Sequence, residues 1–477
     1  MYRIGQSRTA SSRRDFMKRA SALGLSAAAL SKAEAFAANG YRFEDGRRAM
    51  KQSTPVVDVS GTSLKILQWQ HFVPSYDVWF QEFVQEWGEA NGVEVTLDQV
   101  NTADIPAALA AEVAAGSGHD LVEHIAPLAQ YEESVMDLRD VWEEAEALYG
   151  DAVGSCKLNS YNPTTDKYYS FVHGYAPDPA NYRKTLWEAI DMPDGPTTFD
   201  ELLEGGTRIW EEQGVQMGIG MSQEIDSQMA AQAMLWAFGG AIQDENENVV
   251  INTDEAVEAV EFMKSLFNAA MTPEVFSWNA ASNNQLLAAG QASYILNSIS
   301  AYRTAQDTQP DVALDIYLGK PLVGPAGQER ALAHAHAAMG YQIPNHAEHP
   351  DTAKAFLFHL LENYEAGLMA SQLYNFPTFM ETTPGLFEAL ENDPFGSDPA
   401  DKMNVMADAD TWTVNLGWPG PANAMAGEAQ TTFILSNMMA KAARDEMSSA
   451  DSVAEAADLL EQSANTWRER GLMGGGS

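Results

Sequence analysis

The sequence predicts an α/β fold built on a mostly parallel sheet, and three observations support this. Short apolar runs with the period of a strand alternate with longer segments of helical period, which is the βαβ order of a parallel sheet. The chain has 477 residues, of which 45% are hydrophobic and 20% charged, so it has apolar material for two cores. Cys156 is the single cysteine, which excludes an internal disulfide and a thiolate metal cluster.

Residues 1–37 are expected to be an export signal. Arg13 and Arg14 precede a lysine and an apolar run, and Ala35-Phe36-Ala37 forms a small-x-small cleavage pattern. The run is shorter than the roughly 20 residues of a membrane-spanning helix, and its order resembles a twin-arginine (Tat) signal. We therefore expect a soluble, periplasmic or extracytoplasmic protein without a lipid anchor, because no cysteine follows the run.

The mature chain is expected to begin with a polar linker at 38–61, followed by alternating strands and helices. Strands are predicted at 64–69, 93–97 and 120–125, with amphipathic helices at 80–87 and 106–115 between them. This βαβαβ order predicts parallel pairing of the three strands.

Later elements follow from caps and periodicity. Thr198 with Glu201 predicts a capping box, and Thr253 or Asp254 predicts the start of another helix. A helix is expected to open at Asp351 and to be closed by Tyr374 and Asn375. The remaining predictions are a strand-like stretch at 333–343, a last helix at 452–468 and a flexible tail at 472–477.

Several segments together resemble one family. Pro196-Thr197-Thr198-Phe199-Asp200-Glu201-Leu202 is similar to a Pro-x-Thr-aromatic-Asp-Glu-Leu helix start. The segment at 287–294 resembles a Phe-x-x-Gly-Lys-Ala motif, although Gln291 replaces the lysine, and 324–327 resembles a Gly-Pro-x-Gly loop. In this order, the segments resemble the extracellular solute-binding proteins of family 1, the sugar-binding type that serves ABC importers.

The resemblance implies a two-lobed periplasmic-binding-protein-like fold of type II with the ligand in a cleft between the lobes. Each lobe is expected to hold a mostly parallel sheet flanked by helices, and closure about a shared hinge is the expected motion. The lobes would comprise 62–172 with 331–376, and 173–330 with 377–471. A small solute and, transiently, a membrane ABC permease are the implied partners of a monomer that needs no cofactor or metal.

The charge of the chain and its lack of catalytic motifs argue against several classes of function. The chain carries 67 acidic and 28 basic side chains, a net charge of -39, which repels nucleic acids and anionic lipids. The sequence holds no HExxH, GxSxG, GxGxxG after a strand, or P-loop, so an enzyme is not expected. We read Cys156 as an unpaired thiol without a role.

Candidate ligand-binding residues are aromatic or polar side chains at strand ends and in loops. An aromatic plane can cover the C–H face of a sugar while polar neighbours bind its hydroxyls. Open α/β folds bind ligands at the carboxyl ends of their strands. On these grounds the candidates are Trp69, His71, His124, Tyr175, Trp236, Trp278, Asn279, Asn297, Ser298, Tyr374, Trp412 and Trp418.

The ligand class stays open among three alternatives at this point. A mono- or oligosaccharide is the first, and a polyamine or a polyol derivative bound by the same fold is the second. A secreted carbohydrate-active enzyme is the third, and turnover of a sugar would distinguish it. For each candidate residue, ordinary packing or loop capping is the alternative role.

Overall fold

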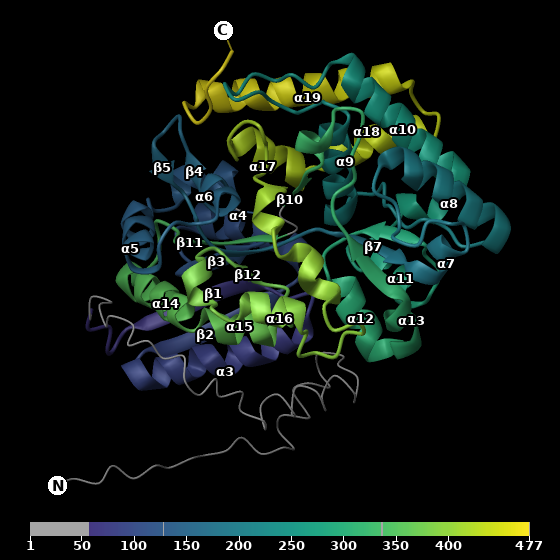
Figure 1. Ribbon diagram of the computed structural model, residues 1–477. Helices are drawn as coiled ribbons and strands as arrows, with labels where there is room; N and C mark the ends of the chain where they lie inside the picture. Colours follow the sequence, from purple (N-terminus) through teal and green to yellow (C-terminus); the bar gives the residue numbers. More distant parts are fainter. Residues whose placement is uncertain (1–56, 127, 335–336, 477) are drawn as a thin grey trace.

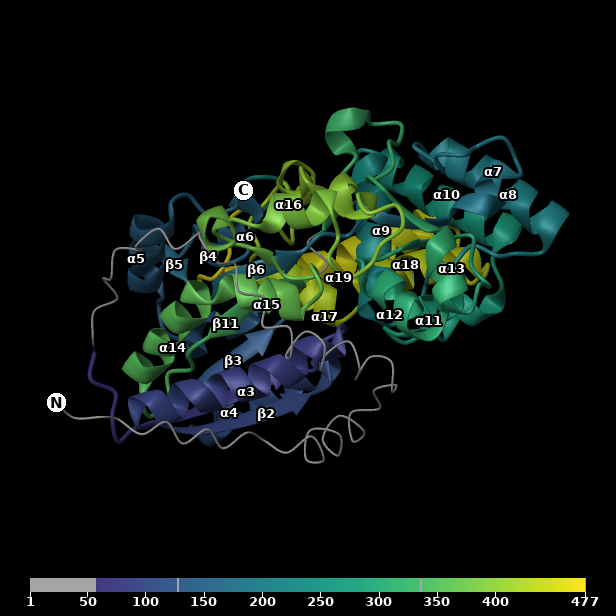
Figure 2. The same cartoon turned by 60° about the horizontal axis from the view of Figure 1, so that its bottom comes forward.

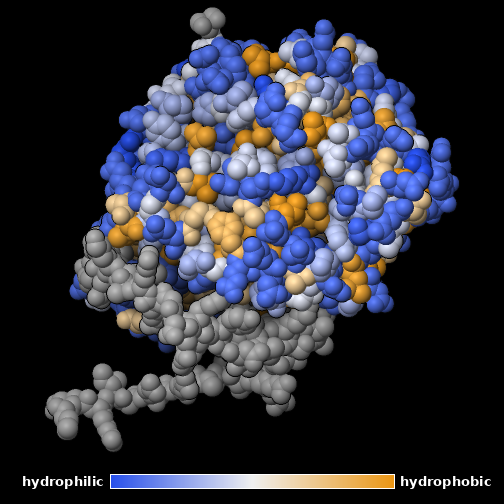
Figure 3. Space-filling view, viewed as in Figure 1, coloured by the Kyte–Doolittle hydropathy of each residue, from blue (hydrophilic) through white to orange (hydrophobic). Residues whose placement is uncertain are grey.

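The computed structural model describes residues 57–126, 128–334 and 337–476 (Figure 1). The expected export signal and most of the expected linker lie outside these residues. Among the helices described, none is both long and apolar enough to cross a membrane. The face seen in Figure 3 is mostly hydrophilic, with apolar side chains gathered near its middle.

A six-stranded sheet organises one side of the molecule, with the strand order β12-β6-β11-β3-β1-β2. Its strands are β1 (Ser63–Trp69), β2 (Glu94–Val100), β3 (Leu121–His124), β6 (Phe171–Ala176), β11 (Ala337–Gln342) and β12 (Phe376–Pro377). β1 pairs in parallel with β2 and β3, as predicted. β11 pairs antiparallel with β3 and β6, and β12 antiparallel with β6, so the sheet is mixed rather than mostly parallel. The βαβ pattern covers only the first three strands, and the others join from distant parts of the chain.

Helices cover this first sheet. They are α3 (Pro74–Asn91), α4 (Ile105–Ala115), α5 (Arg139–Tyr149), α6 (Gly154–Leu158), α14 (Pro350–Glu362), α15 (Tyr364–Ala370) and α16 (Leu386–Glu391). The helix α3 begins with Pro74, whose fixed φ suits the first turn, and ends at Gly92, which has a φ of 69°. Figure 2 shows α3 alongside α14 and α15, and Phe80 meets Phe356 edge to face at 6.0 Å.

A second, three-stranded sheet has the order β8-β7-β9, and both of its pairs are antiparallel. Its strands are β7 (Ala180–Arg183), β8 (Tyr294–Leu296) and β9 (Ile316–Gly319). Helices surround it: α7 (Lys184–Glu188), α8 (Phe199–Gln213), α9 (Ile225–Ala237), α10 (Asp254–Ala270), α11 (Ser282–Ala288), α12 (Ser300–Thr308), α13 (Pro310–Asp315), α17 (Ala424–Thr431), α18 (Ile434–Ala443) and α19 (Ser449–Glu469). A mostly parallel second sheet is therefore wrong as well.

Short elements connect these parts. The two-stranded pairs are β4 (Tyr161–Asn162) with β5 (Lys167–Tyr168), and β10 (Ala333–His334) with β13 (Thr413–Val414). The 3-10 turns are η1 (Thr102–Asp104), η2 (Ala129–Ser134), η3 (Pro273–Phe276), η4 (Gln328–Arg330), η5 (Met380–Thr382), η6 (Lys402–Met406) and η7 (Ala409–Thr411). The single strand expected at 333–343 is thus divided between β10 and β11.

The predicted helix caps can be compared with the structure. Thr198 and Glu201 form the predicted capping box of α8, and the Thr253 side chain accepts the Ala256 N–H at the start of α10. The last helix begins at Ser449, three residues before the predicted start, because Ser448 caps it by accepting the Asp451 N–H. These local signals were sufficient to locate helix starts to within about one turn.

The helix expected between Asp351 and Tyr374 is wrong. The first helix of this segment ends at Glu362 and α15 follows it, after which Gln372 and Leu373 adopt left-handed φ values of 54° and 68°. Two successive left-handed residues cannot continue a right-handed helix. Tyr374 and Asn375 consequently lie in a turn before β12.

Two large apolar clusters fill the protein. The first core packs against the six-stranded sheet and includes Phe80, Tyr341 and Trp412, and it extends to Ile295 of β8 and Leu318 of β9. The second core packs against the three-stranded sheet and includes Trp187 and Trp467. The lobe boundaries expected from the sequence stay a prediction.

The C-terminal residues 470–476, which we call the C-terminal strap, differ from the expected flexible tail. Leu472 and Met473 are buried in the second core, so apolar burial holds this segment against the protein. The Asn162 amide, between β4 and β5, donates to the Leu472 carbonyl at 2.9 Å. The Gly474 N–H donates to the Glu247 carboxylate at 2.7 Å. The strap therefore contacts two segments that are distant in the chain, one at Asn162 and the other at Glu247.

Candidate functional site

The carboxyl end of β1 places Trp69 and His71 inside the protein. Trp69 is 1% exposed and its ring stacks on that of His71, with 4.8 Å between the ring centroids. Among the described residues, the Trp69 indole Nε1 has no hydrogen-bond partner. A fully buried indole N–H without a partner is uncommon and is available to a ligand acceptor.

His71 is held in one tautomer by its hydrogen bonds. Its Nδ1 accepts the Val73 N–H at 2.9 Å, so we assign the ring proton to Nε2, which lies 2.8 Å from Oδ1 of Asn375. Burial lowers the pKa of His71 to about 4, although the Asn375 contact opposes this shift. The ring is therefore neutral at physiological pH and acts as a donor to Asn375.

Tyr374 also contacts the ring of His71. Its ring meets His71 edge to face at 4.9 Å. Burial raises the pKa of Tyr374 well above its usual value, and a side-chain hydrogen bond with Ser298 opposes this effect. Since Ser298 follows β8, the turn at Tyr374 connects the first sheet to the second.

Asn297 continues this polar path at the end of β8. Its amide donates to the Asp226 carboxylate and to Oδ1 of Asn283, both at 3.1 Å. Asp226 lies in the first turn of α9. The structure thus brings five predicted residues into one continuous path between the sheets, which we call the inter-sheet path: Trp69, His71, Tyr374, Ser298 and Asn297.

His124 and Tyr175 belong to the same sheet as this path but make other contacts. The His124 Nδ1 accepts the Ala126 N–H at 3.1 Å, and burial lowers the pKa of this histidine. Tyr175 is buried in β6 and meets Phe376 edge to face at 5.8 Å. Because Phe376 directly follows Asn375, Tyr175 supports the turn that carries Tyr374.

Three of the predicted tryptophans lie near the other end of α9 or near β13. The Trp236 Nε1 donates to the Trp418 carbonyl at 3.1 Å, and the two rings meet edge to face at 5.9 Å. The guanidinium of Arg330 lies 4.8 Å from the centre of the Trp418 ring. Trp412 is buried and donates to Asp408 at 3.2 Å. These tryptophans form a second group, separate in its contacts from the inter-sheet path.

Trp278 and Asn279 lie in the loop after η3. Trp278 is half-buried against the second core, and its carbonyl accepts the Ser222 hydroxyl at 2.7 Å. Asn279 is exposed, and its side chain accepts the Ala281 N–H at 3.0 Å. The structure gives Asn279 a local capping contact, and neither residue has a contact with the inter-sheet path in the part described.

Sequence reasoning missed the acid and amides that end this path. Asp226, Asn283 and Asn284 are all buried beside Asn297. A polar residue in a helical segment normally indicates a solvated face, so the sequence carries no signal that these side chains lie inside. Only the packing of α9 and α11 against β8 brings them together.

The inter-sheet path consists of groups that suit the binding of a small solute. Within residues 57–126, 128–334 and 337–476, no three His, Cys, Asp or Glu side chains are placed to hold a metal ion. The path consists of aromatic rings, hydroxyls and neutral amides around one carboxylate. Such groups bind hydroxyl-rich molecules by hydrogen bonds and ring contacts.

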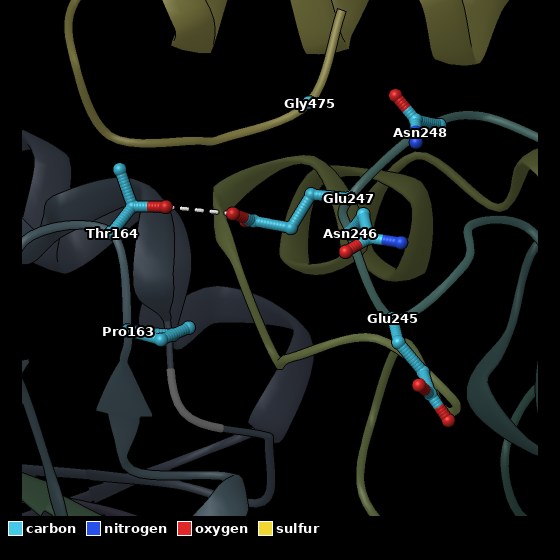
Figure 4. Close-up of a pocket in the computed structure, with 7 residues that line it drawn as sticks. All are labelled: Pro163, Thr164, Glu245, Asn246, Glu247, Asn248 and Gly475. Atoms are coloured by element: carbon cyan, nitrogen blue, oxygen red, sulfur yellow. Dashed lines mark hydrogen bonds between the residues drawn. The ribbon is translucent and has the colours of Figure 1, made fainter.

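An open concavity of about 550 Å³ lies elsewhere and does not contain the predicted residues. Figure 4 shows its lining, in which Thr164 and Glu247 face each other across the cavity. The Glu247 carboxylate is occupied, because it accepts the Thr164 hydroxyl at 2.6 Å, the Gly474 N–H and the Asn423 amide at 2.9 Å. This concavity is a junction between the C-terminal strap and two loops.

Comparison with known proteins gives one family and one fold. Residues 82–432 match the family described as bacterial extracellular solute-binding protein. A binding protein of Brucella abortus (strain 2308) is 21% identical over 179 residues, which cover 37% of this chain and 43% of that protein. The chain therefore aligns with less than half the length of this curated relative.

Two solved structures are similar over most of the chain. An oligosaccharide periplasmic-binding protein from Synechococcus sp. MITs9220, in complex with zinc, matches with a TM-score of 0.71 and 18% identity, covering 84% of this chain and 99% of that one. Maltose-bound MalE3 of T. maritima matches with a TM-score of 0.70 and 18% identity, over the same shares of 84% and 99%. These likenesses confirm the periplasmic-binding-protein fold that the sequence resemblance implies.

Proposed function

Because the chain belongs to the bacterial extracellular solute-binding proteins, we propose that it captures a mono- or oligosaccharide and delivers it to an ABC importer. As a member of this family it is a binding protein and not an enzyme. The proposal concerns the solute that the protein binds, the site of binding and the closure of the protein around the solute.

The inter-sheet path is the observation that carries the proposal. His71 and Tyr374 reach it from the first sheet and Ser298 and Asn297 from the second, so a ligand at this place would touch both. Trp69 supplies a ring and an unpaired N–H beside it. We assign ligand contact to these residues, with Trp278, Trp236 and Trp418 as further aromatic contacts.

Closure of two lobes is part of the proposal. The lobes would be 62–172 with 331–376, and 173–330 with 377–471, so that the chain crosses between them near Tyr175 and Pro377. A cleft can bury most of a small ligand only if it shuts over it. Hinge closure is a recognised motion of periplasmic binding proteins.

The ligand class rests on the solutes of similar proteins and on the chemistry of the path. Maltose occupies the T. maritima protein. A polyamine would need acids free to face it, whereas Asp226 is already bound by Asn283 and Asn297. We therefore favour a neutral sugar. Export through the Tat route would place the protein outside the cytoplasm, where it would meet this sugar.

A thermal-shift panel on the mature protein tests the proposal. Maltose, glucose, spermidine and glycerol 3-phosphate would each be added, because a ligand that binds only the folded state raises the melting temperature. We expect a rise with a neutral sugar and none with the amine or the phosphate. A rise with spermidine alone would overturn the proposed ligand class, and turnover of a sugar on long incubation would overturn a purely binding role.

A further inference from the structure

Helices α9 and α17 lie next to each other near β10 (Figure 1). Gln228 of α9 joins them, because its amide donates to the Ala429 carbonyl of α17 at 3.2 Å. Its side-chain carbonyl accepts the Leu435 and Ser436 N–H groups at 3.1 and 3.0 Å. Both ends of this buried amide are therefore paired, and α9 contacts α17 at this level.

Gln232 lies one helical turn beyond Gln228 on the same face of α9. It is 1% exposed, yet in the described part of the chain neither its Oε1 nor its Nε2 has a hydrogen-bond partner. Gln430 follows Ala429 in α17 and is 4% exposed, and both of its polar atoms also lack a partner among the described residues.

Gln130 reaches the same helix from η2, which follows β3 of the first sheet. A Cβ added to Gly427 of α17 would lie 2.7 Å from the Gln130 Oε1, so this carboxamide lies directly against α17. That oxygen is buried and unpaired within the described residues. Gly427 and Gln430 are three residues apart and share one face of α17. We call Gln130, Gln232 and Gln430 the glutamine cluster.

Along α9, Gln232 lies between the two groups of candidate residues. At its start α9 holds Asp226, which binds Asn297, and at its end it holds Trp236, which binds Trp418. Gln232 is between these ends, and Gln130 approaches from the sheet that carries Trp69 and His71. A ligand on the inter-sheet path that extends along α9 would therefore reach the cluster.

Unpaired amides inside a protein are costly, and apolar side chains of similar size would fill the same space without that cost. A ligand whose hydroxyls paired with these amides would offset that cost. Each primary amide offers a donor and an acceptor and no charge, which matches a hydroxyl and does not neutralise an ion.

We propose that the glutamine cluster is a subsite for a neutral polyhydroxylated ligand, whose hydroxyls pair with the Gln232 and Gln430 amides. The proposal rests on the proposed function and adds to it a place and a chemical class. It excludes a ligand whose charge enters this part of the site.

Methionine substitutions test the subsite, because methionine is unbranched and close to glutamine in size. Gln232→Met and Gln430→Met remove unpaired amides, so we expect the melting temperature without ligand to stay unchanged or to rise. The affinity for a neutral probe, measured by calorimetric titration with maltose or glucose, should fall about 5- to 150-fold. Gln228→Met is the matched control on the same helix face. It removes a fully paired amide, so it should lower the melting temperature and leave the affinity unchanged.

The outcomes separate this inference from the proposed function. If wild type binds a neutral probe and both cluster variants bind it equally well, the subsite is overturned and the proposed function stands. If spermidine is the only probe that binds, both are overturned. If no probe binds, the melting temperatures of the variants decide. A melting temperature that falls as far in Gln232→Met as in Gln228→Met shows that the Gln232 amide is structural, and it overturns the subsite. A melting temperature that rises in Gln232→Met supports the subsite.

Discussion

The Nε2–H of His71 donates to Oδ1 of Asn375 at 2.8 Å, joining the end of β1 to a turn 304 residues further along the chain. The other ring nitrogen accepts the Val73 N–H. Both nitrogens are therefore committed, and a proton on Nδ1 would replace the contact with the Val73 N–H by one to the Val73 carbonyl, which lies 3.1 Å away, inside a buried environment.

This arrangement predicts that the contribution of His71 to protein stability falls in mild acid. The pKa of His71 is about 4 when folded and about 6.5 in an unfolded chain, so between these values the unfolded chain binds the extra proton. The His71 contribution to the free energy of unfolding then decreases as pH falls from about 6.5 toward 4, by up to about 3 kcal/mol. His71→Gln keeps a donor for Asn375 and cannot titrate, so urea unfolding at several pH values should show that wild type loses stability relative to the variant as pH falls.

Asp77 makes the comparison with the variant necessary. Its carboxylate accepts the His71 backbone N–H, and burial raises its pKa to about 8. The folded state then binds the extra proton between about 4 and 8, so this group lowers stability as pH rises. Only the difference between wild type and His71→Gln isolates the histidine, and equal acid slopes in the two proteins would contradict the prediction.

Trp278→Ala is expected to weaken sugar binding more than it weakens the fold. A stacking contact of this kind is worth about 1–3 kcal/mol, or roughly 5- to 150-fold in affinity. The half-buried position should keep the stability loss below the roughly 3–5 kcal/mol of a fully buried tryptophan. Titration and melting of the same variant measure both effects, with Trp210→Ala, an exposed position on α8, as the control. Lost stability with unchanged affinity would identify Trp278 as a packing residue.

Glu247→Gln should loosen the C-terminal strap. Its two carboxylate oxygens accept hydrogen bonds from Thr164, Gly474 and Asn423. A glutamine amide has an NH₂ group in place of one of these oxygens, so at least one of the three donors would lose its acceptor. We expect a loss of about 1–3 kcal/mol in the free energy of unfolding. Glu245→Gln, an exposed neighbour in the same loop, should change it by less than about 0.5 kcal/mol. Similar losses in both variants would argue against a specific role for the buried carboxylate.

Closure on the ligand should be visible in solution. Small-angle scattering of the mature protein should give a smaller radius of gyration with a saturating neutral sugar than without it, because the cleft shuts over the solute. An unchanged profile at saturation would count against hinge closure.

Export should depend on Arg13 and Arg14. Replacing both with lysine should retain the precursor in the cytoplasm, because a twin-arginine signal is read as a pair. Cell fractionation and immunoblotting measure the effect. Undiminished mature protein outside the cytoplasm would show that the signal belongs to another route.

Local signals in the sequence located most of the fold. Thr198 and Glu201 sufficed for the start of α8, and the alternation at Leu64 and Ile66 sufficed for β1, because caps and strand faces depend on near neighbours. The end of the helical segment before Tyr374 was missed because Gln372 and Leu373 are not glycines, and no local sequence signal indicates their left-handed backbone. Sheet direction was missed for a similar reason, since β11 and β12 pair across large sequence distances.

The candidate site was predictable in part. His71, Ser298 and Asn297 were chosen for their places at strand ends. Tyr374 was chosen for a predicted helix end that is wrong. The structure brings the four side chains together, and their contact with ligand stays a prediction. Asp226, Gln232 and Gln430 were missed because they lie within helices, where a polar residue normally faces solvent. Their burial depends on how α9 and α17 pack against each other and against their neighbours, which no local pattern specifies.

The C-terminal strap also links the thermodynamics of the two cores. Its Arg470 pairs with Glu133, close to the first sheet, while Leu472 is part of the second core. If either core lost its structure, the strap would lose contacts on which the other depends. Two cores joined only by hinge strands could melt in separate steps, whereas this cross-link favours a single cooperative transition. The last few residues of the chain thereby help two structural halves to behave as one folding unit.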